Sequence, residues 1–127
     1  MSSPQFREAL RRHPHLAELA SLARSGGGGW TFFQASIHGV ECLYGVRVGL
    51  VVSETITVRA VDDVTVARLR TDDYLAARRV AVPQVLWEYT GTMIDAIGEL
   101  RALPHPEHSA APKLLRPASS MFARGGR

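Results

Sequence analysis

The chain has little of several residues on which specialised folds depend. It contains one cysteine, Cys42, and one lysine, Lys113, among 127 residues. A single cysteine forms no internal disulfide, which excludes a disulfide-stapled secreted domain. No apolar run approaches the roughly 18 residues of a membrane-spanning helix, and residues 1–12 carry arginine where a signal peptide has an apolar core. We therefore expect a soluble, cytoplasmic protein.

The sequence also lacks the motifs that mark common catalytic centres. It has no phosphate-binding P-loop, no dinucleotide-binding fingerprint, no zinc-protease motif and no Ser-His-Asp arrangement. His13 and His15 point to different faces of a helix, and the pair His105 and His108 has no cysteine nearby. A zinc site needs three or four ligands in fixed geometry. The sequence therefore predicts no catalytic residue, no metal site and no cofactor.

One pair of residues has the chemistry of a nucleophile and a base. His38 and Cys42 lie four residues apart in a predicted strand and share one of its faces. Their side chains are then about 13 Å apart along the strand, too far for the hydrogen bond that activates a thiolate. A small-molecule enzyme of unknown class, with His38, Cys42 or Glu88 in a pocket at the mouth of the sheet, remains a second alternative.

The residues that are abundant indicate one folded domain in three parts. With 46% apolar and 21% charged residues, the chain can bury one core without metal or disulfide. Residues 1–25 predict a helical segment kinked at Pro14, because proline interrupts a helix. Four glycines begin residues 26–104, the predicted core. Residues 105–127 are rich in proline and poor in apolar residues, and predict a basic, partly disordered tail.

Alternating apolar residues predict strands through the core. The predicted strands are Trp30–His38, Val40–Val48, Leu50–Val61, Val64–Arg70 and Val85–Tyr89. Residues 71–73 resemble a helix start before a short helix at Tyr74–Arg79. Thr92 begins a second helix, whose apolar stripe is Met93, Ile94, Ile97, Leu100 and Leu103. Short connections favour antiparallel order, so we expect an α+β fold with an antiparallel sheet of about five strands and the helix at 92–103 on one face.

The predicted hairpin between the third and fourth strands carries an arginine-rich face. A two-residue turn at residues 62–63 would pair Arg59 with Val66. In that register Arg59, Arg68 and Arg70 share one face, which is the less apolar one and should point to solvent. A two-stranded ribbon with arginine on one face suits a DNA groove or a row of phosphates. The same face is also typical of any solvated sheet.

The basic character of the chain lies at its two ends. The net charge is +3, yet residues 26–104 carry seven arginines against nine acidic residues, a net of −2. The basic ends and the hairpin face together give one alternative function, nucleic-acid binding. Its candidate residues are Arg59, Arg68, Arg70, Arg116, Arg124 and Arg127.

A compact domain without catalytic signature, flanked by ends that hold apolar residues, favours a different function. We expect a small non-enzymatic interaction module that binds a protein partner or a second copy of itself, and no membrane. An exposed sheet edge, the helix at residues 6–22 and the tail at residues 114–122 are the expected surfaces. The candidate contact residues are Phe6, Leu10, Leu114, Leu115, Met121 and Phe122.

Overall fold

The computed structural model describes residues 19, 21–22, 29–37, 39–77 and 82–119. Its elements follow the chain as β1 (Trp30–Ile37), β2 (Val40–Val48), β3 (Val52–Ala60), β4 (Asp63–Arg70), α3 (Thr71–Leu75), β5 (Gln84–Val85), β6 (Trp87–Gly91), α4 (Met93–Ala102) and β7 (Arg116–Pro117). Five strands form one antiparallel sheet in the order β1-β2-β3-β4-β6, and β5 pairs with β7 in a small second sheet. The predicted α+β class and five-stranded antiparallel sheet are therefore confirmed.

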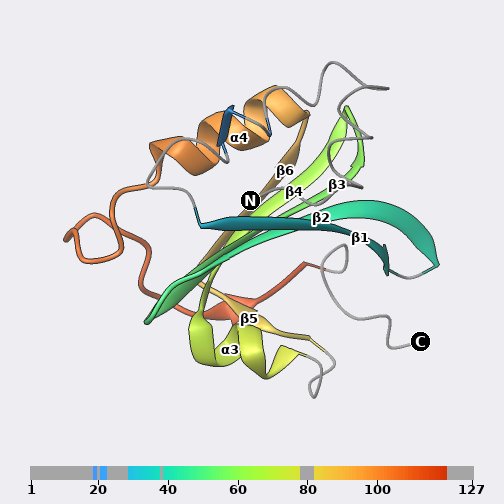
Figure 1. Ribbon diagram of the computed structural model, residues 1–127. Coiled ribbons are helices and arrows are strands. Elements are labelled where there is room, and N and C mark those ends of the chain that lie inside the picture. Colours follow the sequence, from blue (N-terminus) through green and yellow to red (C-terminus); the bar gives the residue numbers. More distant parts are fainter. Residues whose placement is uncertain (1–18, 20, 23–28, 38, 78–81, 120–127) are drawn as a thin grey trace.

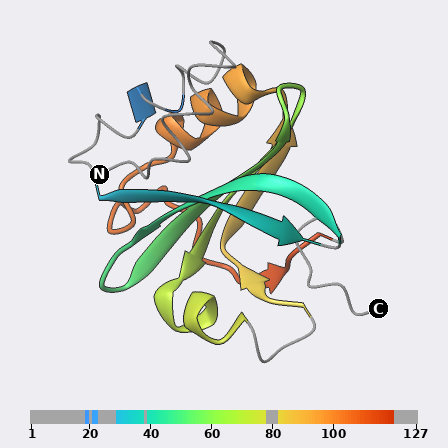
Figure 2. The same cartoon turned by 45° about the vertical axis from the view of Figure 1, so that its right-hand side comes forward.

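The two faces of the main sheet have different neighbours. Helix α4 packs across β4 and β6 on one face, called here the helix face, while α3, β5 and β7 lie on the opposite, rear face (Figure 1). Turning the molecule shows that the strands are strongly curved and that β1 forms one edge of the sheet (Figure 2). Within the described ranges, no helix is both long and apolar enough to cross a membrane.

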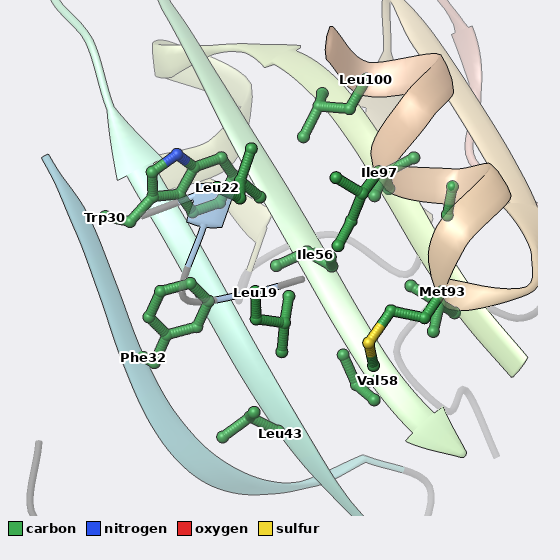
Figure 3. Close-up of a cluster of buried hydrophobic side chains, with 13 residues drawn as sticks. Leu19, Leu22, Trp30, Phe32, Leu43, Ile56, Val58, Met93, Ile97 and Leu100 are labelled. Atoms are coloured by element: carbon green, nitrogen blue, oxygen red, sulfur yellow. The ribbon is translucent and has the colours of Figure 1, made fainter. Parts of the chain in front are cut away.

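The main core lies between the helix face and α4 (Figure 3). Side chains from β1, β2, β3 and β4 meet those of α4 and of two leucines from the N-terminal part of the chain. The buried members are Leu19, Leu22, Trp30, Phe32, Leu43, Ile56, Val58, Val64, Val66, Met93, Ala96, Ile97 and Leu100. Burial of this many apolar side chains is the main stabilising contribution to the domain.

Helix α4 begins as the sequence predicts. The Oγ1 of Thr92 accepts a hydrogen bond from the backbone N–H of Asp95 at 3.1 Å, which caps the first turn. The predicted apolar stripe is wrong at one position, because Ile94 is 69% exposed and Ala96 is buried instead. Ala96 lies three residues after Met93 and one before Ile97, so the buried stripe keeps helical spacing with a smaller residue.

The predicted hairpin register is wrong. The turn lies at residues 61–62, and β3 has an irregularity between Val58 and Ala60, so that Val66 pairs with Ile56 rather than with Arg59. A shift by an odd number of residues moves one strand's side chains to the opposite face relative to its partner. Residues expected to share a solvent-facing surface are therefore divided between the two faces.

The rear face is also more covered than the sequence predicts. Thr55 and Thr57 are at most 1% exposed, although the predicted register puts them on the same solvent-facing side as Arg59, Arg68 and Arg70. A second cluster of buried residues, with Leu69 and Val85 at its centre, lies on this side. Because both faces are covered, β3 and β4 are buried at nearly every position and show no alternation of burial.

Part of the predicted tail packs on the domain. The backbone N–H of Ala118 donates to the carbonyl of Pro83, and β7 pairs with β5. Ala111 and Ala118 are buried. Proline has no backbone N–H to donate, and it is tolerated in β7 because an edge strand leaves some of its N–H groups unpaired in any case. Residues 120–127 lie outside the described residues.

The predicted N-terminal helical segment and its kink at Pro14 also lie outside the described residues, apart from Leu19, Ser21 and Leu22. Leu19 and Leu22 are buried in the main core. The predicted helix at Tyr74–Arg79 corresponds to α3, which begins earlier, at Thr71, and ends at Leu75.

Gly45 lies on β2 between two large core side chains of the neighbouring strands. It pairs with Phe32 on one side and Ile56 on the other. A Cβ at this position would lie 2.5 Å from Cε1 of Phe32 and 2.9 Å from Cγ2 of Ile56. Both neighbours are fully buried, so neither ring nor methyl has room to move aside.

We predict that Gly45→Ala lowers the free energy of unfolding by about 1–3 kcal/mol, because it overpacks the core. The matched control is Gly98→Ala on the exposed side of α4, where a Cβ meets no atom within 4 Å. That change should raise the free energy of unfolding by about 0.5–1 kcal/mol, since alanine favours a helix over glycine. Urea unfolding of both variants measures the difference, and equal effects would contradict the predicted packing.

Candidate functional site

A single row of side chains crosses all five strands of the main sheet on its helix face. Strand pairing places Trp30 beside Arg47, Arg47 beside Glu54, Glu54 beside Arg68, and Arg68 beside Trp87. The row therefore reads Trp-Arg-Glu-Arg-Trp, with one carboxylate between two guanidinium groups. The guanidinium carbon of Arg47 lies 5.5 Å from the centre of the Trp30 ring, a cation–π contact.

Both oxygens of Glu54 accept hydrogen bonds from arginine. Oε1 accepts from Nη2 of Arg47, and Oε2 accepts from Nε and Nη2 of Arg68 at 3.1 and 2.9 Å. Glu54 and Arg68 are 6% and 3% exposed, so this is a buried ion cluster. Nη1 of Arg68 also donates to the carbonyl of Pro104 at 2.8 Å. Arg68 thereby ties the chain just after α4 to the middle of the sheet.

A cavity of about 790 Å³ opens at the end of the sheet that holds this row. The C-terminal half of α4 and the chain after it form one wall, and the ends of β2 and β3 form the other. The charged or titratable side chains that line it are Arg47, Glu54, Arg68, Arg101 and His105, and its apolar lining comes mainly from Leu22, Val48, Val52, Leu100 and Leu103. The lining of the cavity is thus partly apolar and partly charged.

The rim of this cavity is held by hydrogen bonds. Nη2 of Arg101 donates to Oγ of Ser21 at 2.9 Å. Nδ1 of His105 accepts from the backbone N–H of Glu107 at 3.1 Å. A neutral histidine that accepts at Nδ1 carries its proton on Nε2, so its remaining polar atom is a donor. Both rim residues therefore offer hydrogen-bond donors.

A second surface is the free edge of β1. In the part of the chain that the structure describes, β1 pairs with β2 alone. Thr31, Phe33, Gln34 and Ser36 are exposed along it. The Phe33 ring lies 5.4 Å from the Tyr44 ring, centre to centre, in a tilted arrangement on the rear face. This edge presents backbone groups and aromatic surface together.

The turn between β2 and β3 exposes a third, smaller surface. Leu50 is 97% exposed and Val51 is 70% exposed. The turn is nevertheless fixed, because the backbone N–H of Thr71 donates to the carbonyl of Val51 and its Oγ1 donates to the carbonyl of Gly49. The two exposed apolar residues, Leu50 and Val51, therefore lie on a turn that hydrogen bonds hold in place.

The predicted arginine face is not formed. Arg68 is buried on the helix face, in the row described above. Arg59 donates to Asp63 and Thr65 toward the rear face, and only 12% of its side chain is exposed. Arg70 is exposed and donates to Asp73 at 2.9 Å. These three arginines do not share an exposed surface, although their role in nucleic-acid binding stays a prediction. Arg116 is exposed on β7, whereas Arg124 and Arg127 lie outside the described residues.

Two of the predicted contact residues are described. Leu114 is 86% exposed and Leu115 is 38% exposed, both just before β7. Both side chains therefore lie at the surface. Phe6, Leu10, Met121 and Phe122 lie outside the described residues.

Two of the three residues considered for catalysis, Cys42 and Glu88, have separate hydrogen-bond partners. Cys42 is buried, and its Sγ donates to the carbonyl of Ala35 at 3.6 Å. Glu88 accepts from the backbone N–H and the Oγ of Ser119, at 2.7 and 3.1 Å. His38 is outside the described residues. In the described ranges, no three His, Cys, Asp or Glu side chains lie close enough to hold a metal ion.

Tyr44 is the tyrosine whose ionisation the fold changes most clearly. Burial raises the pKa of its phenol above the usual range, and the nearby Tyr74 adds to this increase. A neutral phenol on the rear face is therefore favoured over phenolate in the folded protein.

Comparisons of the chain with protein-family models, curated proteins and solved structures found no match. The function is therefore inferred from the geometry of the cavity and the free edge.

Sequence reasoning missed the charged row, although one signal pointed to it. Glu54 lies two and four residues before Ile56 and Val58, and so falls on the same strand face as two core residues. An acidic side chain on a buried face requires cationic partners. The correct hairpin register would have supplied Arg68 as one of them.

We predict that Glu54→Ala lowers the free energy of unfolding by about 3–5 kcal/mol, because it leaves two buried or half-buried guanidinium groups without their shared carboxylate. Glu41→Ala, at an exposed position of β2, is the matched control and should stay within about 0.5 kcal/mol of the wild type. Urea unfolding measures both values. A small loss for the Glu54 variant would show that the row does not stabilise the fold.

A second prediction concerns alkaline pH. Because the phenol of Tyr44 holds its proton more tightly when folded, the unfolded chain binds fewer protons above about pH 10. The contribution of Tyr44 to stability is complete below that pH and is lost as the pH rises beyond it. Tyr44→Phe should therefore lose less stability than the wild type between neutral and strongly alkaline pH. The difference between the phenolate absorbance titrations of the two proteins gives the pKa of Tyr44, and an ordinary value would contradict the prediction.

Proposed function

We propose that this protein is a small non-enzymatic interaction module that pairs its edge strand β1 with the β1 strand of a second copy. The observation that carries this proposal is the edge of β1, which pairs with no strand other than β2 among the described residues, is eight residues long, exposes four of its side chains and carries no charge. The proposal thus names one interaction surface, the edge of β1, and one partner, a second copy of the chain.

The chemistry of β1 supports pairing. Its sequence, WTFFQASI, has eight residues without proline or charge. Proteins usually protect edge strands with charged residues, proline, bulges or short length, because an open row of N–H and C=O groups recruits another strand. The opposite edge, β6, is five residues long and carries Glu88. Protection is therefore weaker at β1 than at β6.

The symmetry of a dimer fits this edge. Two identical strands that pair antiparallel across a two-fold axis make the same contacts from both copies. Because β1 is uncharged, the two copies bring no like charges together there. The exposed Phe33 and its neighbour Tyr44 would extend the contact beyond the backbone, since paired aromatic side chains add to strand pairing.

Size-exclusion chromatography with light scattering tests the proposal. The wild type should show a mass near twice the chain's 13.9 kDa and should dissociate on dilution. Phe33→Lys should be monomeric at the same concentration, because a lysine on an edge strand opposes pairing.

The matched control is Ile94→Lys, which replaces another exposed apolar residue, on α4, with the same charged side chain. It should remain a dimer. A wild type that is monomeric at every concentration would overturn the proposal, and so would a dimer that survives Phe33→Lys but not Ile94→Lys.

A further inference from the structure

Residues 114–119, called here the strap, lie on the rear face and bury little apolar surface. The strap contains β7, which pairs with the two residues of β5 next to α3 (Figure 1). Of its side chains only that of Ala118 is buried, in the second cluster with Leu69 and Val85. The other five residues of the strap are exposed. Apolar burial therefore contributes little to holding the strap in place.

Hydrogen bonds hold the end of the strap instead. The N–H of Ala118 donates to the carbonyl of Pro83 at 2.9 Å. The N–H and the Oγ of Ser119 donate to the two carboxylate oxygens of Glu88, at 2.7 and 3.1 Å. Among the described residues Glu88 forms no salt bridge. Hydrogen bonds to a charged group are stronger than neutral ones, so Glu88 on β6 is the main polar anchor of the strap.

The chain before the strap is held by contacts of its own. Nζ of Lys113 donates to the carbonyls of Pro106 and His108, at 3.4 and 3.1 Å. Ala111 is buried. These contacts fix the loop at residues 105–113 without using the strap. The strap can therefore leave the rear face, from Lys113 onward, while the loop stays in place.

The main core is attached far more firmly. Helix α4 buries Met93, Ala96, Ile97 and Leu100 against the sheet, and the N–H of Met93 donates to the carbonyl of Val61 at 2.9 Å. Segments with few buried apolar contacts open at a small cost in free energy, whereas core segments open only near global unfolding. The strap belongs to the first kind of segment and α4 to the second.

We propose that the strap opens and closes while the rest of the domain stays folded, and that Glu88 sets the balance between the two forms by binding Ser119. Opening uncovers part of the cluster that Ala118 forms with Leu69 and Val85. A negative charge at residue 119 shifts the balance toward the open form, because two carboxylates then repel each other. Glu88 lies on β6, the edge of the sheet opposite β1, so the opening does not depend on dimer formation.

Amide hydrogen exchange of the full chain, followed by nuclear magnetic resonance, tests the proposal with the amides of Ala118, Ser119 and Met93. The two strap amides should be protected relative to an unfolded chain, yet should exchange at least about 100-fold faster than that of Met93. Strap amides as slow as Met93 would overturn the proposal, because the strap would then open only with the whole domain. Strap amides without protection would also overturn it, since no closed form would exist.

The first variant is Glu88→Gln, which keeps the size of the side chain and removes its charge. Exchange at Ala118 should become about fivefold faster or more, because charge-assisted hydrogen bonds are roughly twice as strong as neutral ones. Exchange at Met93 should not change. The matched control is Glu41→Gln at an exposed position of β2, which should leave Ala118 as in the wild type. Equal rates at Ala118 in the two variants would contradict the role of Glu88, and so would equal acceleration at Ala118 and Met93.

A second pair of variants, Ser119→Asp and Ser119→Asn, differs in charge but not in size. The aspartate brings a second carboxylate to Glu88, so exchange at Ala118 should be about threefold faster or more than in the asparagine variant. Ala118 is the probe because the intrinsic exchange rate of an amide depends on its own side chain and the preceding one, not on residue 119. Equal rates in the two variants would show that the charge of Glu88 does not act on the strap.

Discussion

The carboxylate of Glu54 is the point on which much of this structure depends. It lies on the central strand and binds one arginine from each neighbouring strand, Arg47 on β2 and Arg68 on β4. Because these side chains are buried or half-buried, a slip of either strand pair would leave a charge without its partner, which is far more costly than a lost apolar contact. The cluster therefore favours one register for three strands. Through the bond from Arg68 to Pro104, it also fixes where the chain leaves α4.

The two faces of the sheet also differ in the kinds of side chain that they bury. On the helix face the apolar core occupies the middle and one end of the strands, and the charged row closes the other end, beneath the cavity. On the rear face the buried side chains of β3 and β4 include threonines, and the covering elements are short. Among the described residues, the buried hydroxyl of Thr57 has no hydrogen-bond partner. The helix face thus supplies most of the apolar burial, and the rear face depends on small residues that pack closely.

Local patterns in the sequence predict the elements well and their pairing poorly. The bounds of β2 and the capping role of Thr92 follow from alternation and from helix-start chemistry, which are properties of neighbouring residues. The hairpin register depends on an irregularity near Arg59 that places an extra residue in β3. No local sequence pattern predicts this irregularity, because aspartate residues at 62 and 63 are compatible with a turn at residues 61–62 and with one at residues 62–63. Strand β7 could not be predicted from local pattern either, since it forms by pairing with β5, which lies about thirty residues earlier in the sequence.

The distribution of charge shows why a segment's net charge does not predict its sites. Residues 26–104 are acidic on balance, yet Asp63 and Asp73 are bound by Arg59 and Arg70 close to them in the sequence. Glu54, by contrast, accepts from two arginines on the neighbouring strands, Arg47 and Arg68. Some acidic residues are therefore paired with arginines close to them in the sequence, whereas Glu54 is paired with arginines from the two neighbouring strands. The net charge of a segment therefore does not give the charge at a particular point of its surface, and β1 within this acidic segment carries no charge at all.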